Sequence, residues 1–286
     1  MQWFARVSTR KNIIAIVIGA MLAGAPLVAF NWWLGGLIDR QGQDEVDTSA
    51  KRAIALAESR INQVIGALDG LAARGVDSCS PADIMALRRG VFETAPIKEI
   101  DIVGPRGETL CTDLGLPLGQ RKVADSEPLS GARWYTLDIV QLESGQSMVR
   151  LRRKLSAGPN EIAALVPALL FLPQVSMNGN PFSAYAHVTT AKGMPIGVLG
   201  QSPDTGDAVF SATSSSAKFG LSAEVAMPRS QIVTANHAEL RELGMFVAGA
   251  VVMILGVIAV LIPRRTPGNP VTEIENALRA GEFVPY

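Results

Sequence analysis

The chain has 286 residues, which is enough for one large domain or two modest ones. Apolar residues make up 48% of the sequence and charged residues only 18%, a high apolar content for a soluble protein that fits one lying partly in a membrane. The formal net charge is zero, so the composition has neither the basic surplus of a nucleic-acid-binding protein nor an acidic tail for a basic partner.

The first candidate membrane segment is an uncharged run over residues 12–38, which follows a short, basic N-terminal segment over residues 1–11. The run exceeds the roughly 20 residues that cross a bilayer, and Trp32-Trp33 lies near its far end, where amphipathic rings favour the membrane interface. A cleaved signal peptide is the alternative. However, Pro26 follows the cleavage-like Ala23-Gly24-Ala25, and the apolar sequence continues beyond it. We therefore predict a transmembrane helix over residues 12–38.

A second uncharged run extends from Gly244 to Ile262 and ends at Pro263-Arg264-Arg265. A buried core helix is the alternative, but such a helix is rarely apolar on all sides, so we predict a second transmembrane helix over residues 243–263. Basic residues flank the outer side of each run, which by the positive-inside rule places both termini in the cytoplasm. Residues 39–242 would then be exported, and the chain would be a multi-pass protein of the bacterial inner membrane with a periplasmic domain.

A long helix is predicted from Thr48 to Arg74, with Gly75 as its stop. Apolar residues recur along it at steps of three and four, a near-heptad seam. The seam residues are Ile54, Ala57, Ile61, Val64, Leu68 and Leu71. Two interpretations stay open: the seam packs on the exported domain, or it forms the interface of a homodimer.

A helix followed by a hairpin is predicted after this long helix. Ser80 is a suitable N-cap, Pro81 suits the first helical position, and Asp83 completes a capping box. Strands are predicted over residues 97–103 and 108–112, joined by a turn at Gly104-Pro105-Arg106-Gly107. The pattern suits an α+β fold in which two transmembrane helices flank a mixed α/β periplasmic sensor domain of the PAS or Cache sort, by analogy of architecture.

The rest of the exported region is predicted to be strand-rich. Strands are predicted over residues 148–155, 184–190, 196–199 and 221–226, and a polar loop over residues 211–216. A basic run, formed by Arg150, Arg152, Arg153 and Lys154, is interpreted as a solvated face, with an anion site as the alternative.

The chain contains two cysteines, Cys79 and Cys111, and an even count permits one disulfide in an oxidising compartment. A bridge would staple the start of the predicted helix to the predicted hairpin and stabilise the fold by roughly 3.5–4 kcal/mol on the chain-entropy model. The adjacent helix N-terminus favours the thiolate of Cys79 and hence exchange. A permanent staple and a redox switch both stay open.

Catalytic and metal-binding patterns are absent from the sequence. The two histidines, His187 and His237, are far apart; His187 is expected to pack or hydrogen-bond, and no His/Cys cluster has metal-ligand spacing. Phosphate-binding loops, dinucleotide fingerprints and nucleophile elbows are also missing. We expect no catalytic residue, metal or cofactor in this chain.

The sequence resembles a known family at several motifs. Cys79-Ser80-Pro81, the helix containing Leu87-Arg88-Arg89, and the hairpin that ends in Glu108-Thr109-Leu110-Cys111-Thr112 are similar to the periplasmic CSS-motif domain of membrane-bound EAL-type cyclic di-GMP phosphodiesterases. The third motif position is Pro81 in place of serine, which keeps a helix start but loses a hydroxyl group.

Residues 274–286 resemble the first helix and first strand of an EAL domain, so we assign residues 264–286 to a cytoplasmic linker and the start of that domain. In the family, the EAL barrel hydrolyses cyclic di-GMP with Mg²⁺ or Mn²⁺. The sequence ends before the Glu-Ala-Leu motif and the metal-binding carboxylates, so the chain as given cannot carry this activity. It is expected to be a fragment of a longer enzyme or a truncated gene product.

The resemblance implies that Cys79 and Cys111 form a redox switch whose bridge is made by the periplasmic thiol-oxidising system, with Ser80 and Pro81 supporting the motif. Its state would reach the phosphodiesterase through the membrane helices, through homodimerisation. Membrane lipid is then a partner, nucleic acid is not, and cyclic di-GMP is bound only by the EAL domain. The alternative is a periplasmic small-molecule sensor whose disulfide is purely structural.

Overall fold

The structure is a computed structural model that describes residues 2–117, 121–156, 158–172, 176–177, 180–181, 184–202, 208–235, 237–261 and 270–279. The chain divides into two compact units. Leu37–Asn236 form one unit, which contains both large sheets, and Met1–Gly36 with His237–Tyr286 form the other, which is helical where it is described.

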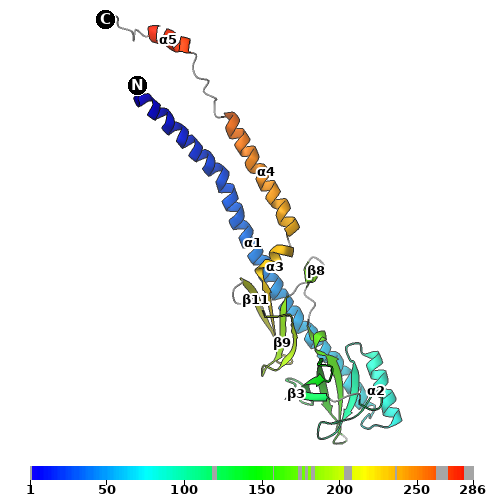
Figure 1. Ribbon diagram of the computed structural model, residues 1–286. Helices are drawn as coiled ribbons and strands as arrows, with labels where there is room; N and C mark the ends of the chain where they lie inside the picture. The colour runs from blue at the N-terminus through cyan, green and yellow to red at the C-terminus, as the bar shows by residue number, and fades with distance from the viewer. Residues whose placement is uncertain are drawn as a thin grey trace. The chain divides into compact units, whose positions relative to one another are not determined.

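Helices and strands follow one another in the order drawn in Figure 1. The helices are α1 (Gln2–Ala73), α2 (Pro81–Glu93), the 3-10 helix η1 (Ala168–Phe171), α3 (Arg229–Ala235), α4 (His237–Leu261) and α5 (Pro270–Arg279). The strands are β1 (Glu99–Val103), β2 (Thr109–Thr112), β3 (Arg121–Pro128), β4 (Tyr135–Leu142), β5 (Ser147–Lys154), β6 (Glu161–Pro167), β7 (Ser176–Met177), β8 (Asn180–Pro181), β9 (Tyr185–Thr190), β10 (Pro195–Leu199), β11 (Val209–Ser216) and β12 (Leu221–Pro228).

Both predicted membrane segments are helical where the structure describes them: residues 12–38 belong to α1, and residues 243–261 belong to α4. When the described helices are tested for a stretch both long and apolar enough to cross a bilayer, none qualifies. The two membrane spans therefore stay predictions.

The apolar seam of α1 packs within the unit formed by Leu37–Asn236. All six predicted seam residues are buried, and Val46, Ala50 and Ala53 extend the buried stripe toward the N-terminus. The interpretation that the seam packs on its own domain is confirmed. Because these side chains are already covered in the single chain, they are not available to form a dimer seam.

The end of α1 follows the predicted stop signal. Gly75 has a positive φ of 78°, a conformation that only glycine adopts readily. The amide of Val76 donates to the carbonyl of Leu71 at 3.3 Å, and the amide of Gly75 donates to Ala72 at 3.0 Å. These two bonds satisfy carbonyl groups of the last turn and end the helix.

The larger sheet has six strands in the order β2-β1-β6-β5-β4-β3, and every neighbouring pair is antiparallel. The predicted hairpin is confirmed as β1 and β2, and one of the predicted strands as β5. The two edge strands, β2 and β3, follow each other along the chain. Residues 113–120 separate them in the sequence, too few for a long helix.

The two faces of this sheet differ in character. One face carries buried apolar side chains, among them Ile100, Leu137 and Ile162, and it contacts the helices: Tyr135 donates from its hydroxyl group to Asp69 of α1 at 2.7 Å. The other face carries charged side chains, considered below. Alternation along antiparallel strands places the two sets on opposite faces.

The smaller sheet has four strands in the order β10-β9-β12-β11. Strands β9, β10 and β12 confirm the remaining strand predictions. The earlier part of α1 contacts this sheet and the segments beside it: Lys218 donates to Asn62 at 2.7 Å, and Gln43 donates to the carbonyl of Ser211 at 3.2 Å.

One segment predicted as a loop is a strand. Residues 211–216 are not a polar loop but part of β11, which pairs with β12 from Val209 to Ser216. Serine-rich sequence gave no strand signal because β11 lies at the edge of its sheet, where polar side chains face solvent. Helix α5 starts at Pro270, where proline suits the first helical position. The predicted first strand of an EAL domain lies outside the described residues.

Candidate functional site

A disulfide joins Cys79 and Cys111, with their Cα atoms 5.9 Å apart and a sequence separation of 32. Cys79 lies two residues before α2, and Cys111 lies on the edge strand β2. The bridge therefore fastens the start of α2 covalently to the edge of the six-stranded sheet.

The two cysteines differ in exposure. Cys79 is exposed to solvent, whereas Cys111 is only 3% exposed. Cys111 is opposite Ile102 in the β1–β2 register, and Ile102 is fully buried. One half of the bridge thus belongs to the surface and the other half to the core.

Hydrogen bonds at the start of α2 hold the segment that carries Cys79. The side chain of Ser80 accepts from the amide of Asp83 at 3.2 Å, and Pro81 occupies the first helical position, as predicted. The carboxylate of Asp83 accepts from the amide and the hydroxyl group of Ser78, at 3.0 and 2.5 Å. Only one half of the predicted capping box is therefore formed. The side chain of Ser80 accepts from the amide of Asp83, but the carboxylate of Asp83 accepts from Ser78 and not from the amide of Ser80. This role of Ser78 was not predicted from the sequence.

A second, noncovalent connection joins α2 to the residue that follows β2. The guanidinium group of Arg88 donates to the carbonyl of Asp113 at 3.2 Å, and the amide of Asp113 donates to Ile100 of β1 at 2.9 Å. Burial raises the pKa of the Asp113 carboxyl group. Helix and sheet also meet closely at Gly90, where an added Cβ would lie 2.9 Å from Ile100 and 3.4 Å from Leu71 of α1.

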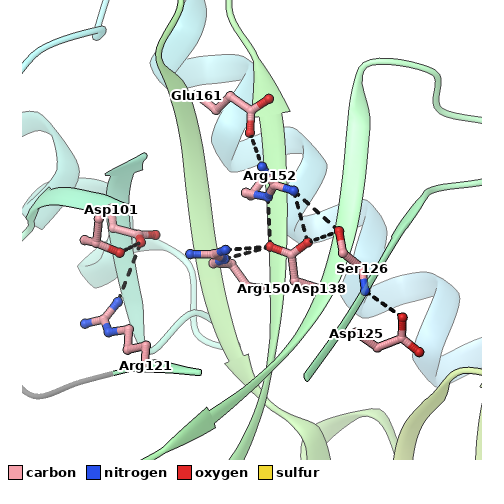
Figure 2. A network of polar contacts seen from close by, with 9 residues as sticks. Asp101, Arg121, Asp125, Ser126, Asp138, Arg150, Arg152 and Glu161 are labelled. Carbon is pink, nitrogen blue, oxygen red and sulfur yellow. Dashed lines mark hydrogen bonds and ion pairs between the residues drawn. The ribbon is translucent and has the colours of Figure 1, made fainter. Parts of the chain in front are cut away.

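Charged side chains form a connected network on the other face of the six-stranded sheet (Figure 2). The buried carboxylate of Asp138 accepts from Arg150 at 2.7 Å, from Arg152 at 2.8 Å and from the hydroxyl group of Ser126 at 2.6 Å. Arg152 also pairs with Glu161 at 2.6 Å. Burial works against the charge of Arg152, but Asp138 and Glu161 outweigh it and raise the pKa of the guanidinium group.

The prediction that the basic run forms a solvated face was wrong for its arginines. Arg150 is 2% exposed, and Arg153, on the opposite face, pairs with Asp69 of α1 at 2.6 Å. The β4–β5 register places Asp138 directly opposite Arg150, so the guanidinium group pairs with a carboxylate and not with water. Sequence spacing alone does not reveal this register.

Asp101 lies near this network, on β1 (Figure 2). Its carboxylate is fully buried and accepts from the hydroxyl group of Thr109 at 3.0 Å, and Arg121 lies 3.6 Å away. Burial raises the pKa of Asp101 to about 6, against the opposing effects of Arg150 and Arg121. Its Oδ1 atom has no hydrogen-bond partner. Arg121 also pairs with Glu99 at 2.5 Å, which ties the start of β3 to β1.

A groove of about 610 Å³ lies within the unit formed by Leu37–Asn236, between the six-stranded sheet and β10. Apolar residues form most of its wall, and four polar residues line the remainder. The lining residues are Ala124, Asp125, Ile139, Gln141, Gln146, Ser147, Pro167, Ala168, Leu169, Pro195, Ile196, Gly197 and Val198. The lining of this groove was not predicted, because it comes from segments far apart along the chain.

The described residues contain no group of side chains suited to hold a metal ion. His187 lies on β9 beside Tyr185, with ring centroids 6.1 Å apart, which confirms the prediction that it packs. His237 begins α4, and its side chain lies outside the described part.

Comparisons with known proteins give one family and some distant structural likenesses. An extracellular ligand-binding receptor from Desulfohalobium retbaense DSM5692 has a TM-score of 0.41 and 10% identity; the match covers 65% of this chain and 40% of the receptor. The sensory domain of the Campylobacter jejuni chemoreceptor Tlp3 (CcmL), solved with isoleucine bound, has a TM-score of 0.38 and 8% identity, over 69% of this chain and 96% of that domain. No curated protein matches the chain.

The family comparison is more extensive. The family described as "CSS motif domain associated with EAL" matches residues 42–239, a range that includes both cysteines, both large sheets and helix α2. The chain therefore belongs to the family of CSS-motif domains that are associated with EAL.

Proposed function

We propose that this chain is the sensor part of a membrane-bound cyclic di-GMP phosphodiesterase and that the redox state of the Cys79–Cys111 bridge regulates the attached EAL domain. The association of the family with EAL supports the first half of this proposal. The observation that carries the second half is the bridge itself, because it joins a surface cysteine at the start of α2 to a core cysteine of β2.

The location follows from the chemistry of the bridge. Disulfides persist in oxidising compartments, so the sensor unit would lie in the periplasm, where a thiol-oxidising system forms the bridge. Residues 12–38 and 243–263 would cross the inner membrane and place both termini in the cytoplasm. Cyclic di-GMP and Mg²⁺ or Mn²⁺ would be bound only by the EAL domain, which would supply the hydrolysis.

A route from the bridge toward the membrane is available through α2. Reduction would free the start of α2, while Leu87, which is fully buried, and the Arg88–Asp113 bond would keep the rest of the helix on the sheet. Gly90 of α2 lies against Leu71 near the end of α1. A shift of α2 would therefore act on α1, whose helical path continues without a break to Gln2.

The test uses this chain in frame with the EAL domain and measures cyclic di-GMP hydrolysis with and without a reductant. Cys79→Ser and Cys111→Ser should change the rate in the same direction and abolish the response to the reductant. Ser80→Ala is the matched control, because it removes the helix cap but leaves the bridge; it should keep the response. Cysteine variants that hydrolyse like the wild type would show that the bridge is a permanent staple.

A second candidate function is a small-molecule sensor, favoured by the groove of about 610 Å³. This volume lies within the range of about 300–1,000 Å³ that is typical of ligand pockets. A ligand of the groove should stabilise the protein while the bridge stays intact. Ala124→Trp should fill the groove and remove this stabilisation, whereas Glu93→Trp, exposed on α2, should not. If no metabolite raises the melting temperature of the oxidised protein, this candidate fails.

A further inference from the structure

The unequal burial of the two cysteines determines where a thiol can attack the bridge. Thiol–disulfide exchange requires the attacking sulfur to approach one sulfur of the disulfide, so the rate at each sulfur depends on access. Cys111 is 3% exposed and lies against the core of the sheet, whereas Cys79 is exposed. The approach to Cys111 is closed by the fold, and the approach to Cys79 is open.

We infer that exchange at this bridge is directional: the partner forms its mixed disulfide with Cys79, and Cys111 is the buried leaving and resolving cysteine. This inference rests on the proposed redox function for its biological use. The partner it implies is a dithiol–disulfide oxidoreductase or another thiol of the exported compartment.

The reduction step can be written in full. A partner thiolate attacks Sγ of Cys79, the Cys79–Cys111 bond breaks, and Cys111 leaves as a thiolate that takes up a proton. The second thiol of the partner, as its thiolate, then attacks the partner sulfur of the mixed disulfide and releases Cys79 as a thiolate. Two electrons pass from the dithiol to the bridge, and the partner becomes a disulfide. Oxidation is the same sequence in reverse, with Cys79 attacking the disulfide of the partner.

The surroundings of Cys79 suit its attacking role in the oxidation direction. The N-terminus of α2, a helix of 13 residues that begins two positions after Cys79, favours negative charge there, which suits an attacking thiolate. In the reduction direction the buried site of Cys111 disfavours the leaving thiolate, so its departure is coupled to proton uptake, and access to Cys79 sets the direction of exchange. After leaving, Cys111 is held on β2 close to Cys79 by the Arg88–Asp113 bond, from which position it can attack the mixed disulfide and restore the bridge.

The test is a trapping experiment on the purified, oxidised chain. Glutathione is added in limiting amount, exchange is stopped with acid, free thiols are alkylated, and the peptides are identified by mass spectrometry. We expect glutathione on Cys79 and the alkyl group on Cys111, with a preference of at least about tenfold over the reverse. An equal distribution, a preference for Cys111 or the absence of any adduct overturns the inference.

A second measurement does not depend on the intact bridge. In Cys111→Ser the remaining Cys79 thiol should react rapidly with an aromatic disulfide reagent, and in Cys79→Ser the Cys111 thiol should react at least about tenfold more slowly until urea unfolds the protein. Equal rates in the folded variants count against the inference.

The two proposals fail in different ways. An adduct on Cys111 overturns the directional exchange but leaves redox regulation of the EAL domain possible. An adduct confined to Cys79, together with phosphodiesterase activity that ignores the bridge, supports the exchange route and overturns the proposed function.

Discussion

Asp138 is the residue on which the charged face of the large sheet depends. It is fully buried and pairs with two arginines, Arg150 and Arg152. Removing the charge of a buried carboxylate leaves its partners uncompensated, which typically costs about 3–5 kcal/mol, whereas the pair itself adds little over apolar packing. Because Arg150 is buried, the folded state needs the carboxylate of Asp138 to compensate its charge.

Asp138→Asn should lower the free energy of unfolding by about 3–5 kcal/mol, because two arginines lose their shared carboxylate. Urea unfolding followed by circular dichroism measures this. Asp125→Asn is the control, since Asp125 is exposed and its carboxylate, among the described residues, accepts only from the neighbouring amide of Ser126; its effect should stay within about 0.5 kcal/mol. Equal effects of the two substitutions would mean that the network does not contribute in this way.

Asp101 should make stability depend on pH. Its pKa is about 6 in the folded protein, above the ordinary value of 3.8, so the folded state holds the proton more tightly than the unfolded state. Its contribution is thus fully present below pH 3.8 and is lost as the pH rises through about 6, on the order of 3 kcal/mol in all.

Asp101→Asn cannot ionise, so the difference in unfolding free energy between wild type and variant should shift by that amount in favour of the variant between pH 4 and pH 7. Urea titrations at several pH values test it. A difference that stays constant with pH would contradict the assignment.

Among the elements, α2 was well predicted, since Ser80, Pro81 and the spacing of Leu87 are local signals. Strand β3 was missed because it is an edge strand whose side chains are almost all exposed, so it lacks apolar alternation. Strand β11 was missed for its serine content. The pairing of Asp138 with Arg150 and the lining of the groove depend on register and on contacts between distant segments, which local sequence does not encode.

Ser80→Ala should destabilise the protein by about 1 kcal/mol, because the amide of Asp83 loses its acceptor at the start of α2. Thermal unfolding of the oxidised protein measures the change. Ser144→Ala, in an exposed turn, serves as the comparison and should be near neutral. If Ser80→Ala leaves the stability unchanged, the disulfide alone positions the start of α2.

At the scale of the whole molecule, the bridge closes a loop between positions 79 and 111 that contains α2 and the β1–β2 hairpin. The chain-entropy model gives a stabilisation of roughly 3.5–4 kcal/mol for a loop of this length. A typical domain is stable by only about 5–15 kcal/mol, so the state of the bridge changes a large share of the total.

Reduction of the wild type should therefore lower the unfolding free energy by about 3–4 kcal/mol. The double variant Cys79→Ser, Cys111→Ser should show the same loss and no further response to a reductant. Chemical denaturation in the two redox states measures both. A reduced protein as stable as the oxidised one would remove the thermodynamic basis for a switch.

The open edges of the two large sheets limit how copies of this chain can associate. Strand β2 is only four residues long, β3 has a bulge near Ala124 and ends at Pro128, and β10 begins at Pro195 with an irregular register. Strand β11 is long and regular, but Gln43 of α1 already occupies its Ser211 carbonyl. Interrupted or covered edges resist intermolecular strand addition. Copies of this protein crowded at a surface would thus be protected from amyloid-like growth, and a homodimer would have to assemble without extending either sheet.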